Sequence, residues 1–220
     1  MCNFTNVSDD SPMGYLVDTP EVRALIEETQ RLTRDIESDV DRVAQLTPAF
    51  QALLASDGWL PEEYATPDET SGMGGGIGQY ALYRAEDGSL CLFSLVIPAG
   101  STTPVHDHLA WGLIGLYQGR QAETVYHRVD GGGDEAHADL HITSEHEVDR
   151  GELYALLPPE GDIHKVTTIS DKPSISIHLL ANDTACVWRH RFDPEAGTVV
   201  PFRSGYSNAP CPPEEATSVR

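Results

Sequence analysis

The feature that most limits the possible folds is a long run of short strand patterns from Gln79 onward. Apolar and β-branched stretches alternate there with turn residues, and no helical period of three to four residues lies between them. We predict about nine strands, at residues 79–84, 90–97, 111–118, 121–128, 139–143, 153–157, 164–169, 174–180 and 185–192. Parallel strands need long crossover connections, so strands this close together predict an antiparallel sandwich or barrel.

A helical pattern precedes the strands. Thr19 can cap a helix whose apolar residues recur every three or four positions to about Leu46. Pro48 predicts a restart, with a short second helix at 49–55. The charged face of these helices could contact a partner, but the pattern favours a solvated face.

The helical and strand patterns divide the chain into four parts. We expect a loose N-terminal arm at 1–17, a helical segment packed on the barrel at 18–71, the barrel domain at 72–208 and a C-terminal tail at 209–220. The barrel begins with the glycine-rich segment 72–78. No Gly-Lys-Ser/Thr follows this segment, so it is expected to be a connector and not a phosphate loop.

Charge limits the partners of the protein. The 220 residues include 14 basic and 35 acidic side chains, a formal charge of −21. A surface this negative repels phosphate backbones and anionic lipids, so we expect no nucleic-acid partner and no membrane docking. No apolar stretch reaches the roughly 20 residues of a membrane span and no signal pattern is seen, so we expect a cytoplasmic protein. A small-molecule partner is favoured, and both a monomer and a homodimer remain open.

The four cysteines lie far apart and form no CxxC pair. This spacing favours reduced thiols over a disulfide scaffold or a zinc knuckle. Cys91 and Cys186 lie in apolar runs, where we expect inert core residues with raised thiol pKa values.

Three histidines have a spacing typical of metal ligands. His106 and His108 project from the same side of an extended chain while Asp107 points away, and their neighbours are apolar. His164 begins a later strand, after a turn containing proline and glycine. Three imidazoles that converge can bind a divalent metal and leave coordination positions open for chemistry.

Other polar and aromatic residues are weaker candidates. Ser176 and His178 share a strand face, but the chain has no Gly-x-Ser-x-Gly elbow, so serine hydrolase chemistry is not expected. Solvated side chains are expected for the histidines His127, His137, His141, His146 and His190. Core or pocket-wall positions are expected for the tryptophans Trp59, Trp111 and Trp188.

At this point the sequence resembles the cupin superfamily. The first signature reads Gly100-x5-His106-x-His108-x3-Gly112-x6-Gly119, and the second reads Gly151-x7-Pro159-x-Gly161-x2-His164. The resemblance implies a double-stranded β-helix, or jelly-roll barrel, with a pair of N-terminal helices. Most cupins have a glutamate where this chain has Gly112, which implies a site of three histidines. Neutral ligands leave Fe²⁺ its full positive charge, which favours an anionic thiolate or carboxylate.

Among three-histidine cupins, residues 79–208 are most similar to the thiol dioxygenases of the cysteine dioxygenase family. This resemblance implies Fe²⁺ on His106, His108 and His164, and oxidation of a small thiol by O₂ to a sulfinic acid. Cysteine and 3-mercaptopropionate are typical substrates. Catalytic roles are implied for His178 and Ser176, and substrate binding for Arg84, Tyr83 and Trp111.

Two of these roles keep alternatives open. Arg84 would hold a substrate carboxylate, but a shift of one residue in strand register would turn it outward to the surface. Ser176 and His178 would line the iron pocket or else be satisfied polar groups of the core.

The chain departs from the family at Leu180, where a tyrosine is usual. Leucine cannot hydrogen-bond, so either Tyr206 or Tyr154 supplies the hydroxyl or the substrate differs from cysteine. Gly112 also replaces the cysteine that crosslinks to this tyrosine in animal members, so no such crosslink is expected.

Competing functions share the fold. One alternative is a metal-containing cupin that binds a small molecule without turnover. Another is a cupin that uses Mn²⁺ or Ni²⁺ to cleave a carbon–carbon bond or to isomerise a sugar. A DNA-binding regulator is disfavoured by the acidic helical segment.

Overall fold

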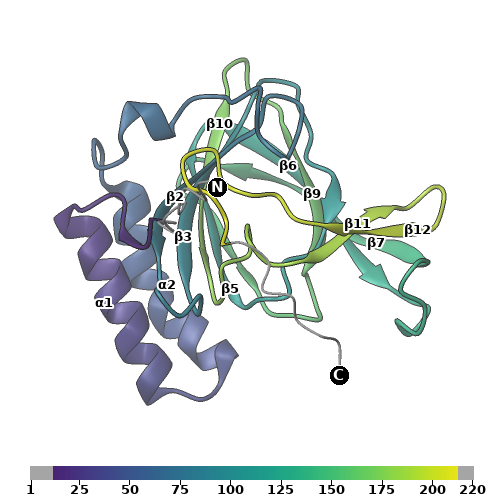
Figure 1. Ribbon diagram of the computed structural model, residues 1–220, viewed down its shortest axis with the longest axis horizontal. Helices are drawn as coiled ribbons and strands as arrows, with labels where there is room; N and C mark the ends of the chain where they lie inside the picture. Colours follow the sequence, from purple (N-terminus) through teal and green to yellow (C-terminus); the bar gives the residue numbers. More distant parts are fainter. Residues whose placement is uncertain (1–11, 213–220) are drawn as a thin grey trace, which may run out of the picture.

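The computed structural model describes residues 12–212, which form a barrel of two sheets with two helices on one side (Figure 1). The first sheet has the order β1 (Gly14–Tyr15), β2 (Gly78–Arg84), β3 (Cys91–Ile97), β10 (Ser174–Leu180), β5 (Gly112–Gln118) and β8 (Leu153–Leu156). The second has the order β12 (Thr198–Phe202), β11 (Arg189–Asp193), β4 (Val105–His106), β9 (Ile163–Thr168), β6 (Arg120–Arg128) and β7 (Leu140–Asp149). Every pairing within these sheets is antiparallel. The fold is therefore mainly β, a cupin double-stranded β-helix with two N-terminal helices.

The two helices divide at a different place from the one predicted. Helix α1 (Pro20–Asp35) is capped by Thr19, and α2 (Asp39–Ala55) is capped by Ser38, whose side chain accepts from the Asp41 amide at 3.3 Å. The prediction of one helix to about Leu46 is wrong, because the Ser38 cap starts a new helix. Pro48 lies inside α2, so the predicted restart there is also wrong.

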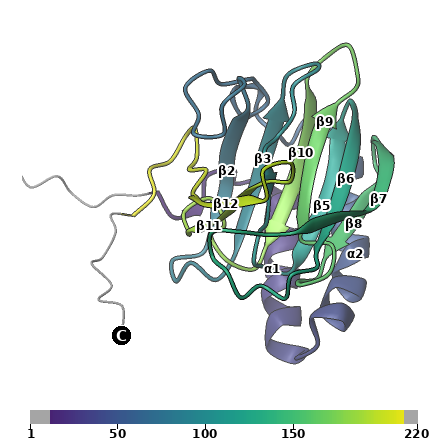
Figure 2. The same cartoon turned by 90° about the vertical axis from the view of Figure 1, so that its right-hand side faces the viewer.

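The first sheet is buried on both faces. Helix residues such as Leu25 and Phe50 pack with Leu82, Leu92 and other side chains on its outer face. Figure 2 shows β2, β3 and β10 side by side in this sheet. A second apolar cluster, including Phe93, Ile114 and Leu180, fills the barrel interior. Burial on both faces explains why these strands read as continuous apolar runs.

Several short elements were missed by the strand prediction. Strands β1, β4 and β12 were not predicted, because two-residue strands and a strand with an internal proline have no readable alternation. Strand β7 is twice as long as predicted, and β11 begins later, at Arg189. Residues 12–17 pair with or pack on the barrel and are not a loose arm, whereas residues 1–11 of the predicted arm lie outside the described residues.

A short 3-10 helix, η1 (Glu62–Tyr64), precedes the glycine segment 72–78, which connects the helices to β2 through a series of turns. Gly74, Gly75 and Gly76 all have positive φ values. This backbone conformation favours glycine, which explains the three glycines in these turns.

Two of the cysteines form a disulfide. Cys186 and Cys211 are bonded, with their Cα atoms 5.2 Å apart. The prediction that the thiols are reduced, and that Cys186 is a core residue, is therefore wrong for this pair. Residues 25 positions apart meet because the chain returns to the β10–β11 loop after β12, which spacing alone does not reveal. Cys91 is a buried free thiol, and burial raises its pKa to about 11.

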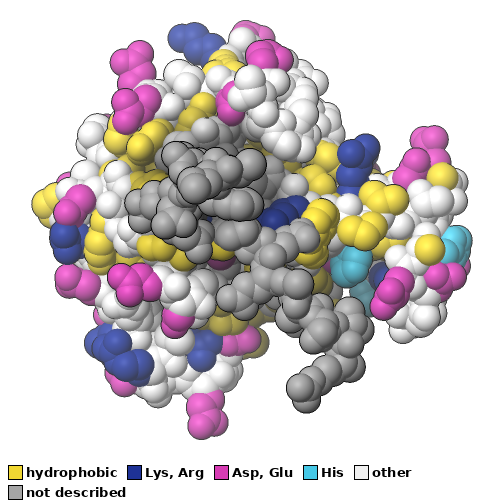
Figure 3. Space-filling view, viewed as in Figure 1, with side chains coloured by type: hydrophobic (Ala, Val, Ile, Leu, Met, Phe, Trp, Pro, Cys, Tyr) yellow, Lys and Arg dark blue, Asp and Glu magenta, His cyan; other side chains and the backbone are white. Residues whose placement is uncertain are grey.

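The described surface carries the acidic charge of the sequence in scattered form. Figure 3 shows Asp and Glu side chains distributed over the visible face and not gathered in one patch. Among the described residues, no helix is long and apolar enough to cross a membrane.

Candidate metal centre

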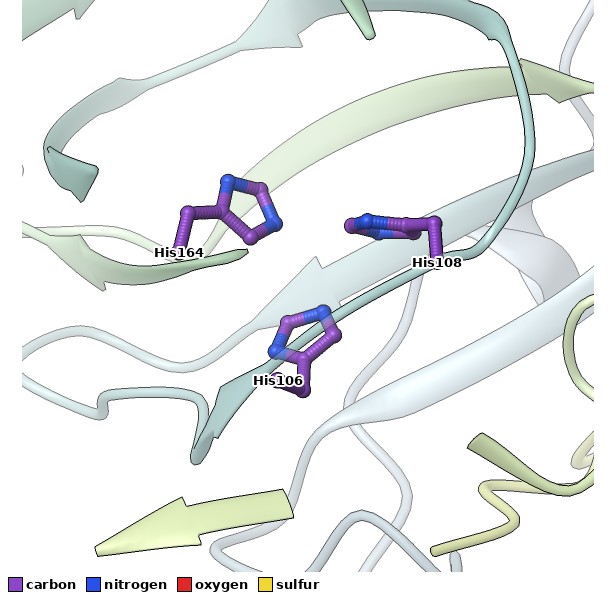
Figure 4. A group of neighbouring side chains, drawn as sticks. All are labelled: His106, His108 and His164. Atoms are coloured by element: carbon purple, nitrogen blue, oxygen red, sulfur yellow. The ribbon is translucent and has the colours of Figure 1, made fainter. Parts of the chain in front are cut away.

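Three histidines from two strands and one loop converge inside the barrel. His106 on β4 is the register partner of His164 on β9, and His108 follows two residues after His106. A nitrogen atom of each ring lies within 4.8 Å of those of the others (Figure 4). All three residues are at most 3% exposed. The convergence predicted from the sequence is confirmed.

Two of the imidazoles are held by a hydrogen bond at Nδ1. Nδ1 of His106 lies 2.9 Å from the Pro104 carbonyl oxygen, and Nδ1 of His164 lies 2.5 Å from Oε1 of Glu123. Nδ1 of His108 lies 3.4 Å from Oδ1 of Asp162 and makes no hydrogen bond within the described residues. A carbonyl or carboxylate oxygen can only accept, so Nδ1 of His106 and Nδ1 of His164 carry the proton, and Nε2 of each of these two rings keeps its lone pair.

Burial keeps the rings of His106 and His108 neutral. Burial lowers the pKa of His106 well below its ordinary value, and the charge of Arg189 lowers it further. Burial lowers the pKa of His108 to about 4, although Asp162 opposes this shift. Three buried imidazoles, each with a ring nitrogen close to those of the other two, fit a divalent transition metal. The identity of the metal does not follow from three imidazoles, which several such ions accept.

Asp162 fastens the two histidine segments to each other. Its Oδ1 accepts from the His108 amide at 2.9 Å and its Oδ2 from the Leu109 amide at 3.1 Å. Leu109 has a φ of 57°, which is rare for a residue with a branched side chain. Because Asp162 precedes His164 by two residues, one carboxylate sets the position of the loop carrying His108 relative to β9.

Ser176 and His178 lie on β10 beside this centre. The His178 ring stacks on Phe93 with centroids 4.5 Å apart, and its centroid is 6.3 Å from that of His108. Ser176 Oγ is 3.0 Å from His178 Nε2. Within the described residues, the buried Nδ1 of His178 has no hydrogen-bond partner. Burial lowers the pKa of His178 well below its ordinary value, so the ring is neutral.

Arg84 does not face the site as an available clamp. It is fully buried, and its guanidinium binds Oδ2 of Asp183 through Nη2 at 2.6 Å and through Nε at 3.1 Å. It also donates to the carbonyls of Pro12 and Pro210. The geometry gives no support to the predicted carboxylate clamp, because Asp183 already neutralises the guanidinium.

Tyr83 and Trp111 lie on the opposite face of the first sheet. Gln30 of α1 donates to the Tyr83 hydroxyl at 3.1 Å, and the Arg42 guanidinium of α2 lies 4.8 Å from the Trp111 ring centroid. Tyr83 belongs to the core under the helices, and Trp111 is partly buried against it. These positions are away from the three histidines, and substrate binding by Tyr83 and Trp111 stays a prediction.

Leu180 is explained by its neighbours. Its register partners are Cys91 on β3 and Gly112 on β5, and a Cβ atom on Gly112 would lie 2.5 Å from a Leu180 methyl carbon. The leucine thus fills the space left by the glycine. Of the two hydroxyls proposed as substitutes, Tyr206 donates to Asp183 at 2.7 Å, while Tyr154 lies with its ring centroid 6.4 Å from that of His164.

Sequence reasoning missed Arg189, a buried cation beside the site. It is 4% exposed, and its donors bind the carbonyls of Asp107 and Thr184 and the hydroxyl of Ser204. None of these partners is charged, and burial lowers the Arg189 pKa to about 10. The sequence offered no signal for it, because Arg191 has the same place in the strand alternation and is exposed.

Contacts of three more residues around the site were also missed. Glu123 on β6 is 2% exposed and lies two residues after the buried Gln121. The alternation of buried residues along this strand could have indicated that Glu123 points inward. His146, assigned to solvent, lies with Nε2 2.9 Å from Oε2 of Glu123, and His190 has Nδ1 2.6 Å from Oδ2 of Asp107. His127, His137 and His141 are exposed as expected.

Comparisons with known proteins give weak similarities. No protein-family model matches the chain. It is similar to the cupin domain of Cnp3 from Schizosaccharomyces pombe, with 16% identity, a TM-score of 0.37, 49% of this chain covered and 62% of that one. It is also similar to a Klebsiella pneumoniae protein with a double-stranded β-helix domain, with 16% identity and a TM-score of 0.38. That match covers 58% of this chain and 91% of the other. The similarity to an oxalate oxidase has 16% identity and a TM-score of 0.34. It covers 44% of this chain and 43% of the oxidase, so this chain spans less than half of that one.

The strand order and the histidine geometry define the class of protein. The chain has the cupin superfamily fold with a buried metal-binding triad of three histidines. The site is consistent with a metalloenzyme, and no particular family within the superfamily follows from the comparisons.

Proposed function

We propose that this protein is an iron-dependent dioxygenase that oxidises a small thiol to a sulfinic acid. In this reaction the O–O bond breaks, two S–O bonds form, and the thiol sulfur loses the four electrons that reduce O₂. Fe²⁺ bound by His106, His108 and His164 would supply the site at which thiolate and O₂ meet.

The observation that carries the proposal is the neutral ligand set. Within the described residues, the cluster contains three imidazoles and no carboxylate. A divalent ion there keeps its positive charge, which favours capture of an anionic sulfur ligand.

The remaining pocket residues have roles consistent with this reaction. His178 is neutral, is oriented by Ser176 and Phe93, and has an unpaired Nδ1 that can hydrogen-bond to a bound molecule. Arg189 has five guanidinium N–H groups, of which three make hydrogen bonds inside the protein. The other two can hold a substrate carboxylate, so we assign to Arg189 the anchoring role first predicted for Arg84.

The test is O₂ consumption by protein purified without oxygen and loaded with Fe²⁺. Cysteine, 3-mercaptopropionate and cysteamine are supplied in turn, and the sulfinate product is measured by mass spectrometry. One O₂ is expected per sulfinate formed, and H106A, which lacks a ligand, serves as the inactive control. Absence of thiol-dependent O₂ uptake across a broad thiol panel would refute the proposal.

A charge-conserving variant tests the anchor. Lysine at position 189 keeps the charge but loses the planar two-point contact, so R189K is expected to raise KM for 3-mercaptopropionate at least tenfold. Cysteamine has no carboxylate, so its KM should change little. Equal effects on both substrates would remove Arg189 from the proposed role.

Leu180 favours a second candidate, a metal-containing cupin that binds a small molecule without turnover. The leucine is fully buried and offers no hydrogen bond where thiol dioxygenases resembling this chain have a hydroxyl. Single-turnover O₂ consumption separates the two functions, because both include bound metal but only the dioxygenase consumes O₂.

A further inference from the structure

The carboxylate of Glu123 contacts the histidine His164 of the metal centre from within the barrel wall. Glu123 lies on β6, where its neighbours across the sheet are on β7 and β9. Its Oε1 lies 2.5 Å from Nδ1 of His164, and the residue is 2% exposed. Burying a carboxylate is costly unless its oxygens are bound, so this placement needs specific partners.

The second oxygen of Glu123 lies near a histidine on the outer side of the wall and, within the described residues, makes no hydrogen bond. Oε2 is 2.9 Å from Nε2 of His146, whose side chain is 43% exposed. Both residues line an open pocket of about 390 Å³ together with Tyr154. In the described part of the chain, the ion-pair partners of Glu123 are these two histidines, and no Arg or Lys pairs with it. The carboxylate therefore lies between one imidazole inside the barrel and one at the surface, and it is hydrogen-bonded to the inner one.

We propose that Glu123 is a positioning residue of the metal centre, which fixes the Nδ1–H tautomer of His164 and places a negative charge behind an otherwise neutral ligand set. A carboxylate hydrogen-bonded to a histidine ligand raises the basicity of the ligand and orients its ring. Glu123 thereby strengthens metal binding without occupying a coordination position. This inference rests on the metal site of the proposed function and not on its thiol chemistry.

Glu123 differs in this respect from Asp162. Asp162 accepts from the backbone amides of His108 and Leu109, so it mainly shapes a loop. Glu123 contacts side chains only, and its substitution changes the charge at His164 without releasing a backbone amide.

The test compares metal binding by the wild type, E123Q, E123D and a control. Glutamine keeps the size and one acceptor oxygen but loses the charge, whereas aspartate keeps the charge on a shorter side chain. E145Q is the matched control, because Glu145 is exposed on the neighbouring strand β7 and its substitution changes the net charge equally. Co²⁺ affinity is measured by competition with a chromophoric chelator, and the visible spectrum is recorded at full Co²⁺ loading.

E123Q is expected to bind Co²⁺ about 10- to 100-fold more weakly than the wild type, with E123D intermediate and E145Q unchanged. The Co²⁺ bands of saturated E123Q should also shift, which a general loss of stability would not cause. Thermal unfolding of the metal-free variants shows whether the fold is intact, and E123D provides the comparison if E123Q does not fold.

Each outcome separates the two proposals. Co²⁺ affinities of E123Q and E123D within twofold of the wild type would overturn the role of Glu123 and leave the proposed function standing. Weaker binding by E123Q, together with no thiol oxidation by the wild type, would support Glu123 and overturn the dioxygenase. A wild type that binds no Co²⁺ would overturn both.

Discussion

Replacement of Asp162 by alanine tests how the two histidine segments are held together. Asp162 accepts one hydrogen bond from the His108 amide and one from the Leu109 amide, and it is 4% exposed. A hydrogen bond to a charged group contributes about 1.5–3 kcal/mol, so losing two should lower the free energy of unfolding by about 3–6 kcal/mol. D162N keeps one acceptor oxygen and should lose about half as much.

The measurement is urea unfolding of metal-free protein, which separates the hydrogen bonds from metal binding. D171A is the matched control, because Asp171 is exposed and its substitution removes the same charge. Its free energy of unfolding should stay within about 0.5 kcal/mol of the wild type. If D162A loses less than about 1 kcal/mol, or no more than D171A, Asp162 does not hold the two segments together.

Three further predictions concern other parts of the barrel. The disulfide between Cys186 and Cys211 closes a loop with a sequence separation of 25. The C186S/C211S variant should therefore have a free energy of unfolding about 3–4 kcal/mol lower, measured by urea unfolding. A variant as stable as the wild type would argue against the bond. Because burial lowers the pKa of His178, metal-free protein should lose stability as the pH falls below about 6.5, where the unfolded state binds a proton that the folded state does not. H178F, which cannot take up this proton, should show a shallower decline between pH 6.5 and 4, and an unchanged slope would contradict the assignment. L109G should raise the unfolding free energy by up to about 1 kcal/mol by relieving the positive φ, and a loss of stability would show that the leucine side chain matters more.

The sequence predicts the parts of the fold that repeat a pattern. Strands such as β2, β3 and β10 have long apolar runs, and their predicted bounds agree with the structure to within one residue. The helix break at Ser38 was missed because a cap competes with an apolar stripe that continues through it. Proline was given too much weight at position 48, where α2 accommodates it.

The metal ligands could be predicted, and their surroundings could not. The His106–His108 spacing and the turn before His164 are local signals, so the triad followed from the sequence. Arg84 and Arg189 show the limit, because which arginine meets a carboxylate depends on contacts between distant segments. Asp183 lies 99 positions from Arg84 in the chain, and no local pattern indicates such a pair.

The placement of β4 has a consequence for how the metal centre forms during synthesis. This two-residue strand lies between β9 and β11, so His106 gains its flanking strands only when residues near positions 164 and 191 have left the ribosome. Loop closure over such separations is slow compared with helix formation, and α1 and α2 can form well before it. The three histidines therefore come together late in synthesis, and a metal ion would bind to a nearly complete barrel.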